Sequence, residues 1–508
     1  YGTASFYDFM KKEHEGVKAH VCNGSACLVA GTQEKVREKL SKHLKPKEIG
    51  HMCCLGRCHE NSAFSYGETN YSGDSIEKLE DIFSKSNSDL SDNYRVEASC
   101  ERVLTASPLK AEEYKRLFTE VLENGADWAL EQIKASNIRG RGGAGFPMHF
   151  KLNACRNEPA EQKFIVCNAD EGDPGAYSDR YLLEVQPMLV LFGMMTAGFV
   201  VGADYGAVYI RGEYPESVKA MSDAVAELEA IGMHGDNIGG TDFNYRFKVI
   251  EGAGAYICGE ETALLSSLEG QRPEVRVRPP FPAQKGLFNK PTIVNNVETL
   301  AAVPWIVKNG GEKYSEIGTD KSTGTKLVCL DSFFNKPGMY EVEMGSSFKD
   351  LVYDLGGGFK EPVKAVKKLQ EENTILQKQI EQLLKDKAQN LSGELKNQLQ
   401  EINGVQFLAT KIDLDANGVR NLAFALGKEY QNLFLLFASS PKKDKAILTC
   451  YISKELANER GYNAGTVVRE LGKLIHGGGG GQPFFATAGG RNPGGIPKVL
   501  ERAKDYLV

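Results

Sequence analysis

A glycine-rich loop constrains this chain more than any other stretch of its sequence. The loop reads RGRGGAGFP over Arg139–Pro147, and an acidic run, NADEGDPG, follows at Asn168–Gly175. Four glycines in six positions leave backbone N–H groups bare, so that a phosphate and a flat ring can lie against them. The pattern therefore predicts a nucleotide pocket. An ordinary glycine-rich turn is the alternative, because the run before the loop, Leu130–Ser136, is helix-like, whereas a dinucleotide fingerprint normally follows a strand.

Composition bounds the classes of protein to which the chain can belong. Its 508 residues are enough for about three to four domains, and 41% apolar with 25% charged residues is ordinary globular composition. The net charge of −6 argues against a general nucleic-acid binder. The most apolar run, Met188–Ala203, is shorter than the roughly 20 residues of a membrane-spanning helix. We therefore expect a buried helix and no transmembrane segment.

The chain begins at Tyr1 without a signal peptide, which we interpret as the start of a fragment. Its 11 cysteines favour a reducing, cytoplasmic setting, where thiols bind metals more often than they form disulfides. Five of them lie in the first 87 residues, on an order of strand, helix, strand and strand that is typical of thioredoxin-like domains. Their C-x4-C and C-x3-C spacings suit four thiolates around a [2Fe–2S] cluster, with zinc as the alternative.

Further blocks follow the glycine loop and the acidic run. They read YIRGEY from Tyr209, GAGAYICGEETAL from Gly252, RPPFPA from Arg278 and KPTIVNNVET from Lys290. In this order the blocks resemble the flavin-bearing, NADH-oxidising subunit of respiratory complex I and its relatives in NAD-linked hydrogenases and formate dehydrogenases. The resemblance covers about residues 108–366.

The N-terminal cysteine region carries a second resemblance. The motifs ASFY from Ala4, VCNGSAC from Val21 and CLGRC from Cys54 resemble the small thioredoxin-like [2Fe–2S] subunit that partners the flavin subunit. In NAD-linked hydrogenases the two modules share one chain, as they do here. The resemblance leaves Cys53 as a buried neighbour of the cluster. The ligands that it implies are Cys22, Cys27, Cys54 and Cys58.

Together these resemblances imply an FMN-dependent NADH dehydrogenase, or diaphorase, that passes electrons from NADH through FMN to iron–sulfur centres. A flavin accepts paired electrons and releases them singly, so the protein needs no catalytic acid or nucleophile. The implied partners are NADH and other iron–sulfur subunits of a hydrogenase, formate dehydrogenase or complex I-like assembly. The predicted cofactor-binding residues are Gly140, Arg141, Gly142, Gly143, Gly145, Phe146, Lys151, Asn168, Asp170, Glu171, Gly259, Glu260, Glu261, Arg278, Phe281, Asn295 and Asn296.

Roles within this set follow from the same resemblance. Lys151 and Asn168 would contact FMN, and Asn295–Asn296 would hold its phosphate or ribityl side. Phe146 and Phe281 would stack on the NADH rings, although core packing is the alternative for both. The acidic residues would form two walls that accept ribose hydroxyls and repel a 2′-phosphate, which predicts a preference for NADH over NADPH.

The chain departs from the family pattern close to the loop. His149 stands where the family has a glycine, Leu152 where it has a tryptophan, and Arg278 where a lysine is common. A lost glycine can crowd a cofactor, and a lost aromatic ring can weaken nicotinamide stacking. The departures therefore favour flavin binding over full activity.

The resemblance ends inside a small domain. Residues 324–363 resemble the start of the β-grasp domain that follows the flavin domain, but the family's C-x2-C-x2-C motif for a [4Fe–4S] cluster is absent. A heptad pattern follows, which predicts a coiled coil or one arm of a helical hairpin broken at Ser392–Gly393, with a return arm through Leu395–Ile402. Its a positions are Val366, Asn373, Ile380 and Lys387, and its d positions are Leu369, Leu376 and Leu383.

The C-terminal tail has an α/β pattern, with strands expected near Val405–Thr410, Phe434–Ala438 and Ile447–Ile452, and a run of five glycines from Gly477. From about residue 364 onward it resembles the C-terminal end of alanyl-tRNA synthetase, which implies dimerisation and tRNA contact but neither aminoacylation nor editing. A flexible linker is the alternative for the glycine run. Basic residues near the end suit a phosphate backbone, and a solvated helix face explains several equally well. They are Arg469, Lys473, Arg491, Lys498 and Arg502.

Two functions follow from this organisation. The first is an NADH-oxidising electron-transfer module; the alternative is a tRNA-binding and dimerising module in a chimeric chain whose dehydrogenase portion is inert. The sequence predicts an α/β multidomain fold. Its parts are a thioredoxin-like [2Fe–2S] domain at 1–87, a linker at 88–107, a Rossmann-like FMN/NADH domain at 108–323, a truncated β-grasp domain at 324–363, a helical hairpin or coiled coil at 364–402 and a C-terminal α/β domain at 403–508.

Overall fold

The computed structural model describes residues 2–84, 95–360, 362–414, 416–442 and 444–507. The chain divides into two compact units, Tyr1–Lys360 and Glu361–Val508. The division lies within a few residues of 363–364, where the sequence predicts the change from the truncated β-grasp domain to the helical segment. Residues 88–94 of the predicted linker lie outside the described part, as do the side chains of three predicted heptad positions, Val366, Leu383 and Lys387.

The N-terminal domain is a small sheet covered by short helices. Its strand order is β2-β1-β3-β4, with β1 parallel to β2 and antiparallel to β3. Val36 and Leu40 on α2 pack against Phe64 of β3 and form its core. The elements are β1 (Ala19–Cys22), α1 (Ser25–Ala30), α2 (Gln33–Leu40), β2 (Ile49–Met52), β3 (Phe64–Tyr66), β4 (Thr69–Tyr71) and α3 (Leu79–Ser84).

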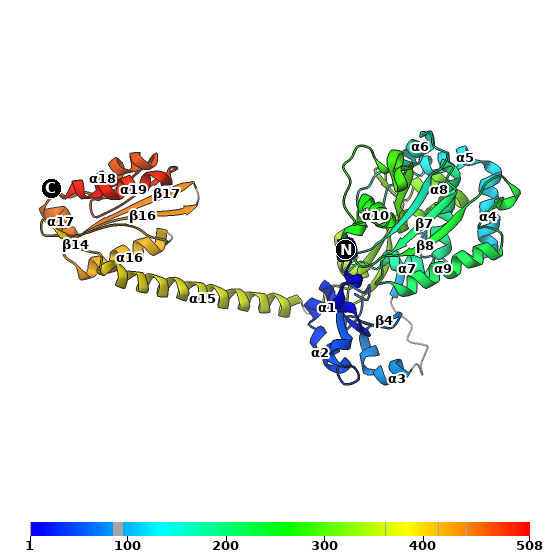
Figure 1. Cartoon of the computed structure of the whole chain (residues 1–508), viewed down its shortest axis with the longest axis horizontal. Coiled ribbons are helices and arrows are strands. Elements are labelled where there is room, and N and C mark those ends of the chain that lie inside the picture. The colour runs from blue at the N-terminus through cyan, green and yellow to red at the C-terminus, as the bar shows by residue number, and fades with distance from the viewer. Residues whose placement is uncertain (1, 85–94, 361, 415, 443, 508) are drawn as a thin grey trace. The chain divides into compact units, whose positions relative to one another are not determined.

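The second domain is built on a parallel sheet of four strands with the order β8-β7-β6-β9 (Figure 1). The chain runs from β6 outward through β7 to β8 and then returns to place β9 on the other side of β6. The strand order therefore reverses between β6 and β9, and open α/β sheets bind ligands at the carboxyl ends of the strands at such a point. The strands are β6 (Phe164–Ala169), β7 (Tyr205–Ile210), β8 (Arg246–Glu251) and β9 (Thr292–Asn296).

Helix α8 (Pro187–Val201) is the apolar run that the sequence singles out, and it is buried almost throughout, as a helix that is apolar on all sides must be. It approaches α12 closely, because a Cβ atom at Gly193 would lie 2.1 Å from the carbonyl oxygen of Leu300. Within the described residues, no single helix is long and apolar enough to cross a membrane; α7 and α8 reach that length and hydropathy only as a pair bent by 93°.

The remaining helices of this domain cover the sheet or precede it in the chain. The helix-like run before the glycine loop, Leu130–Ser136, is confirmed as the second half of α5, and α4 precedes it. The helices are α4 (Ala111–Asn124), α5 (Ala126–Ala135), α6 (Met148–Asn157), α7 (Ser178–Val185), α9 (Pro215–Ala230), α10 (Glu261–Leu268), α11 (Pro282–Lys285), α12 (Val297–Ala301), α13 (Val303–Asn309) and α14 (Gly311–Ser315).

A buried glutamate ties the segment before α4 to the end of the first unit. Strand β13 (Gly338–Glu343) pairs with β12 (Thr325–Leu330) and, in parallel, with β5 (Arg95–Ala98). The Glu341 carboxylate accepts three backbone N–H groups from residues 103–105 and two hydroxyls, all at 2.7 to 2.9 Å. Residues 95–107 are therefore an integral part of the fold, and their assignment to a linker is wrong.

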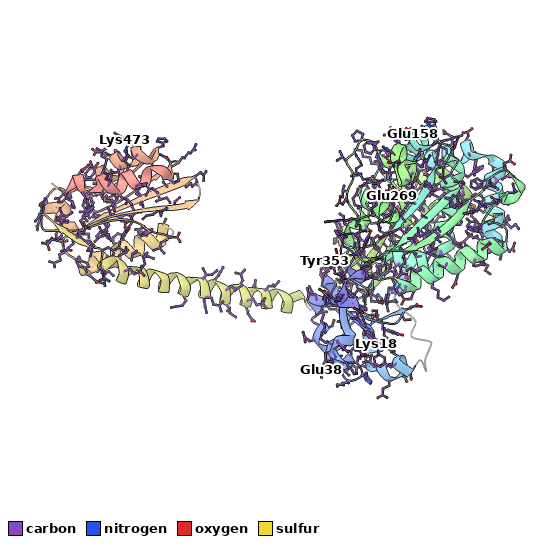
Figure 2. The ribbon with its side chains drawn as sticks, in the orientation of Figure 1. Lys18, Glu38, Glu158, Glu269, Tyr353 and Lys473 are labelled. Atoms are coloured by element: carbon purple, nitrogen blue, oxygen red, sulfur yellow. The ribbon has the colours of Figure 1, made fainter. Side chains whose placement is uncertain are left out.

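The predicted β-grasp segment is a small piece of structure. After β12 and β13 it contains a helical turn at Asp350–Leu355. Two large side chains are left outside the core: Phe348 is 85% exposed, and Tyr353, labelled in Figure 2, is 61% exposed.

The second unit begins with α15 (Pro362–Lys396), a single 35-residue helix. The predicted break at Ser392–Gly393 and the return arm are wrong. A glycine inside a helix costs only about 1 kcal/mol, and Leu395 just beyond it is buried against α16. Lys396 also forms an ion pair with Glu429 of α16 at 2.6 Å. These contacts hold the last turns of α15 in helical conformation.

A sheet of six strands follows, with the order β14-β15-β16-β17-β19-β18. Alternate residues of β16 point into two different hydrophobic clusters, so both faces of the sheet are covered. The predicted strands near residues 405, 434 and 447 are confirmed, and the glycine run forms the edge strand β18. The elements are β14 (Gln400–Ile402), β15 (Val405–Lys411), α16 (Ala416–Glu429), β16 (Leu433–Lys442), β17 (Lys445–Ile452), α17 (Lys454–Glu459), α18 (Ala464–Leu471), β18 (Gly477–Gln482), β19 (Phe485–Gly490) and α19 (Ile496–Arg502).

Replacing Glu341 tests the role of the buried carboxylate. Glu341→Leu leaves three buried N–H groups without an acceptor, so we expect the free energy of unfolding of the first unit to fall by about 3 kcal/mol or more. The chain's two tryptophans, Trp128 and Trp305, both lie in that unit, so tryptophan fluorescence during urea denaturation reports on it alone. Glu343→Leu, two residues along the same strand and exposed, is the matched control and should change little. Equal effects of the two variants would contradict this account.

Candidate functional site

A cavity lies at the carboxyl ends of β6 and β9, where the strand order reverses. It has a volume of about 540 Å³, within the range of small-molecule and cofactor sites. Nine of the predicted cofactor residues line it, together with nine others that the sequence did not single out. The predicted ones are Arg141, Gly142, Gly143, Asn168, Asp170, Glu171, Gly259, Glu260 and Asn296.

The glycine loop forms one wall of this cavity. It lies between α5 and α6 and closes on itself, because Gly140 donates its N–H to the carbonyl oxygen of Phe146 at 2.9 Å. A side chain at Gly142 would crowd Asn296, with its Cβ atom only 3.1 Å from the asparagine Cβ. Gly143 has a φ angle of +110°, which side-chain-bearing residues rarely adopt. Two glycines are therefore required by local geometry, independently of any ligand.

Arg141 fixes the loop to the rest of the domain. Its backbone N–H donates to the hydroxyl of Thr299 at 2.8 Å, and its guanidinium donates to the carbonyl oxygen of Thr323. Gly145, which lies outside the cavity lining, accepts from Arg139 at 3.1 Å. Arg141, Gly142 and Gly143 thus line the cavity, while hydrogen bonds between the two ends of the loop hold it closed.

Glu171 supports the second wall. Its carboxylate is buried and accepts hydrogen bonds at the start of α7, from the Ser178 hydroxyl at 3.2 Å and the N–H of Asp179 at 3.1 Å. It also accepts from the Arg180 N–H and the Tyr214 hydroxyl, each at 3.3 Å. Burial raises the pKa of Glu171, while the N–H donors oppose that shift. Its oxygens are therefore already engaged by the protein.

Asp170 differs from its neighbour Glu171. One of its carboxyl oxygens, Oδ2, is buried and accepts no hydrogen bond from any described residue. Burial raises the pKa of Asp170 to about 7, although the charge of Arg211 lowers it. Asp170 is thus the cavity carboxyl with a free oxygen and a protonation state that changes near neutral pH.

The predicted second acidic edge is a network of ion pairs. Glu260 caps α10 by accepting the N–H groups of Thr262 and Ala263, each at 2.9 Å. Arg278 lies 2.7 Å from Glu261 and 3.5 Å from Glu260. Neither Glu261 nor Arg278 lines the cavity. Of the predicted residues on this edge, Gly259 and Glu260 do.

Lys151 lies behind the same edge. Its ammonium donates to the carbonyl oxygen of Val294 in β9 at 2.7 Å and lies 3.5 Å from the Glu261 carboxylate. Asn168 donates to the carbonyl oxygen of Gly259 at 2.8 Å and so links β6 to that edge. Of these two predicted FMN contacts, Asn168 lines the cavity and Lys151 does not.

The two asparagines at the end of β9 have different surroundings. Asn296 donates to Asp179 at 2.7 Å, and its oxygen caps α12 by accepting the Glu298 N–H at 3.0 Å. Asn295 is buried outside the cavity lining, and its Nδ2 atom donates to no described residue. Only Asn296 therefore faces the cavity directly.

Sequence reasoning missed a buried charge cluster in the cavity floor. Lys326 of β12 forms an ion pair with Glu298 of α12, and Asp179 lies close to both. Burial, with the neighbouring carboxylates, raises the pKa of Asp179 far above its ordinary range. Burial opposes the charge of Lys326, but the Glu298 carboxylate outweighs it and raises the Lys326 pKa. Glu298 stands in a motif that the sequence displays, but Lys326 reaches the site only through the fold.

The predicted aromatic contacts lie outside the cavity lining. Phe146 is 51% exposed and Phe281 54% exposed, so neither packs into a core. Tyr256, which the sequence analysis left unassigned, donates its hydroxyl to Asp173 at 2.6 Å across the cavity rim. His149 contacts the ring of Phe150 and does not line the cavity, so the expected crowding by His149 is not observed. Leu152 is fully buried in the core.

The four predicted cluster thiols come together from two segments: Cys22 ends β1 and Cys27 lies in α1, while Cys54 and Cys58 lie in the loop after β2. All four are buried. The sulfur atoms of Cys54 and Cys58 are 3.4 Å apart. Hydrogen bonds from Cys22 and Cys58 lower the pKa of Cys54 to about 2. In the described residues no group of three or more Cys, His, Asp or Glu side chains has the arrangement of a site for a metal ion. Cys53 is exposed, so its prediction as a buried neighbour is wrong.

The loop after Glu171 connects the cavity to these thiols. Gly172, Asp173 and Ala176 line the cavity, while the backbone N–H of Gly175 acts to lower the pKa of the thiols of Cys54 and Cys58. Arg180, in the helix that the loop enters, donates to the carbonyl oxygen of Gly56 at 2.6 Å. The cavity and the thiols therefore share one short segment of backbone.

Comparison with known proteins agrees with this geometry. The F 2 subunit of the NADH-quinone oxidoreductase of Rhizobium meliloti is 46% identical over 245 residues, which are 48% of this chain and 58% of that protein. The HndC subunit of the NADP-reducing hydrogenase of Solidesulfovibrio fructosivorans is 47% identical over 229 residues, 45% of this chain and 46% of that protein. The chain thus spans about half the length of these relatives.

A solved structure extends the comparison to the fold. The air-oxidised crystal structure of an NAD⁺-reducing [NiFe]-hydrogenase aligns with 70% of this chain and 63% of its own chain, at 30% identity and a TM-score of 0.60. Residues 133–305 match the Nuo51 FMN-binding domain family, and residues 404–508 match the DHHA1 domain family, over the tail that resembles alanyl-tRNA synthetase. Residues 133–305 are therefore similar to Nuo51 FMN-binding domains, and residues 404–508 are similar to DHHA1 domains.

Proposed function

We propose that the first unit is an NADH-oxidising electron-transfer module that holds FMN in the cavity and a [2Fe–2S] cluster on four thiols. The observation that carries the proposal is the shared segment, because the loop after Glu171 lines the cavity and the helix that it enters donates from Arg180 to the carbonyl oxygen of Gly56 in the thiol loop. The module would work as a subunit of a larger assembly, as the relatives named above do. FMN would supply the conversion of paired electrons to single ones.

The cavity residues fit FMN in size and in chemistry. At Gly143 nothing lies within 4 Å of the position that a Cβ atom would take, so a flat ring can approach the backbone there without meeting side chains. Arg141 and Lys326 supply positive charge for a phosphate. The free Oδ2 atom of Asp170 offers a hydrogen-bonding partner for the polar edge of a flavin. The role of the protein is to bind and orient, since no nucleophile is needed.

The thiol set fits a [2Fe–2S] cluster in donor type and number. Four buried cysteines provide the ligands that such a cluster takes, and the apolar residues Met52, Leu55 and Ala63 surround two of them. Zinc was the alternative, but its paired cysteines are usually two residues apart. A [2Fe–2S] assignment places a one-electron acceptor beside the cavity wall.

The C-terminal unit carries a second candidate function, dimerisation with tRNA contact. Four large apolar side chains on α15, Leu369, Ile375, Leu376 and Ile380, are between 55% and 66% exposed, as expected of a helix that pairs with another chain. Arg420 lies over the rings of both Phe424 and Phe485 in the DHHA1 domain. Stacked aromatic and guanidinium groups of this kind suit a nucleic-acid surface.

Reconstitution tests the first function against the second. After incubation with FMN, iron and sulfide under anaerobic conditions, the full chain should show flavin and iron–sulfur absorbance and reduce a dye with NADH. Gly142→Val places a branched side chain against Asn296 and should weaken FMN binding at least tenfold, measured by quenching of flavin fluorescence. Gly478→Val in the second unit, where a Cβ atom meets nothing within 4 Å, is the control. Colourless protein that shifts tRNA in a gel would instead support the second candidate.

Coenzyme preference is a separate test. We expect NADH to be oxidised with at least tenfold higher kcat/KM than NADPH, because the acidic residues of the rim repel a 2′-phosphate. One relative belongs to an NADP-reducing hydrogenase, so both coenzymes must be assayed on the same preparation. Glu260→Gln, which removes a carboxylate of the cavity lining, should narrow the difference in kcat/KM, and Glu161→Gln, on the exposed surface outside that lining, should not. Equal efficiency with the two coenzymes would show that the proposed preference is wrong.

The raised pKa of Asp170 predicts a pH-dependent stability. Between about pH 4 and pH 7 the folded chain holds a proton on Asp170 that the unfolded chain releases, so stability falls as the pH rises through this window. The difference in unfolding free energy between wild type and Asp170→Asn should therefore decrease by up to about 4 kcal/mol from pH 4 to pH 8. Urea denaturation of the FMN-free chain, followed by tryptophan fluorescence, measures it. Asp173→Asn, an exposed carboxylate of the same loop, is the control; a flat difference for Asp170→Asn would refute the shift.

A further inference from the structure

A buried arginine lies at the back of the cavity wall. Arg211 directly follows β7 and is only 4% exposed. Its Nη1 atom donates to the backbone carbonyl oxygen of Glu171. Its Nε and Nη2 atoms lie 3.0 and 2.9 Å from the carboxylate of Glu213, which is also buried. The guanidinium is therefore held in one position by the cavity wall and by a single counter-charge.

The same arginine borders the thiol loop. Its guanidinium stacks over the ring of Tyr214, 4.9 Å from the ring centroid. The Tyr214 hydroxyl packs against Gly56, since a Cβ atom built there would lie 2.8 Å from it. The charge of Arg211 acts on Asp170 in the cavity and on Cys54 in the thiol set. One fixed positive charge thus faces both sites.

We infer that Arg211 is a positioning residue that sets the reduction potential of the iron–sulfur centre at Cys54, with Glu213 as the counter-charge that moderates it. The inference rests on the proposed function. A cluster gains one negative charge on reduction, and a fixed positive charge in a low-dielectric interior stabilises the reduced form. Glu213 opposes this effect, so loss of the Arg211 charge should lower the reduction potential and loss of the Glu213 charge should raise it.

Charge-neutralising variants separate this role from a purely structural one. Removing one partner of a buried ion pair destabilises a fold, whereas removing both is often tolerated. The series is therefore Arg211→Gln, Glu213→Gln, the double variant with both changes, and Arg211→Lys, which keeps the charge. Folding of each is checked by tryptophan fluorescence, and cluster content by iron and sulfide analysis.

The measurement is a redox titration of the reconstituted full chain, followed by the electron paramagnetic resonance of the reduced cluster. We expect the midpoint potential to rise in the order Arg211→Gln, double variant, wild type, Glu213→Gln, with Arg211→Lys close to wild type. The equilibrium constant for reduction should fall about tenfold in Arg211→Gln, which corresponds to about 59 mV for a one-electron couple. If that variant does not fold, the ordering of the double variant, wild type and Glu213→Gln decides.

Two negative outcomes are distinguishable. Wild-type chain that assembles no [2Fe–2S] cluster would overturn the proposed function and this inference together. Wild-type chain that assembles the cluster and shares one midpoint potential with all variants would overturn the inference alone. A merely structural role for the pair would change stability and cluster content without producing opposite shifts for Arg211→Gln and Glu213→Gln.

Discussion

The buried carboxylate of Glu171 is the constraint on which the site depends. Its four donors include two N–H groups at the start of α7 and the hydroxyl of Tyr214, so it fixes that helix relative to β6. The intervening loop then has little freedom, and it lines the cavity while the backbone N–H of Gly175 acts to lower the pKa of Cys54. Arg180 of the same helix binds the thiol loop at Gly56. The Glu171 carboxylate thus fixes the position of the cavity wall relative to the thiols.

The sequence identifies those parts of the site whose cause is local. Gly143 needs a positive φ angle and Gly142 a bare Cα, so the glycine pattern reports directly on the loop. The four thiols are likewise visible through their spacing. Lys326 is not, because only the pairing of β12 and β13 carries it to the cavity floor, well over 100 residues from the loop. In the sequence, Asp179 resembles an ordinary acidic residue in the first turn of a helix, and only the structure shows that it is buried.

The errors also have physical causes that lie outside local sequence. Gly393 suggests a helix break, yet Leu395 is buried against α16 and keeps α15 continuous. A flexible linker, the alternative for the glycine run, is likewise excluded because the run forms an edge strand whose backbone lies directly on β19; a Cβ atom at Gly479 would lie 2.2 Å from the Thr487 carbonyl oxygen. In both cases a tertiary contact outweighs the local preference of glycine.

An acidic cavity lining would by itself repel the phosphate of a cofactor. Most of these carboxylates, however, already have partners within the protein. Glu171 is engaged by its donors, Glu260 caps α10, and Glu298 is paired with Lys326. Burial favours the neutral form of Asp179. What remains to act on a ligand is the charge of Arg141, the ammonium of Lys326 and the free oxygen of Asp170. The acidic run therefore builds the wall first, and Asp170 is the member with a buried oxygen that accepts no hydrogen bond from the described residues.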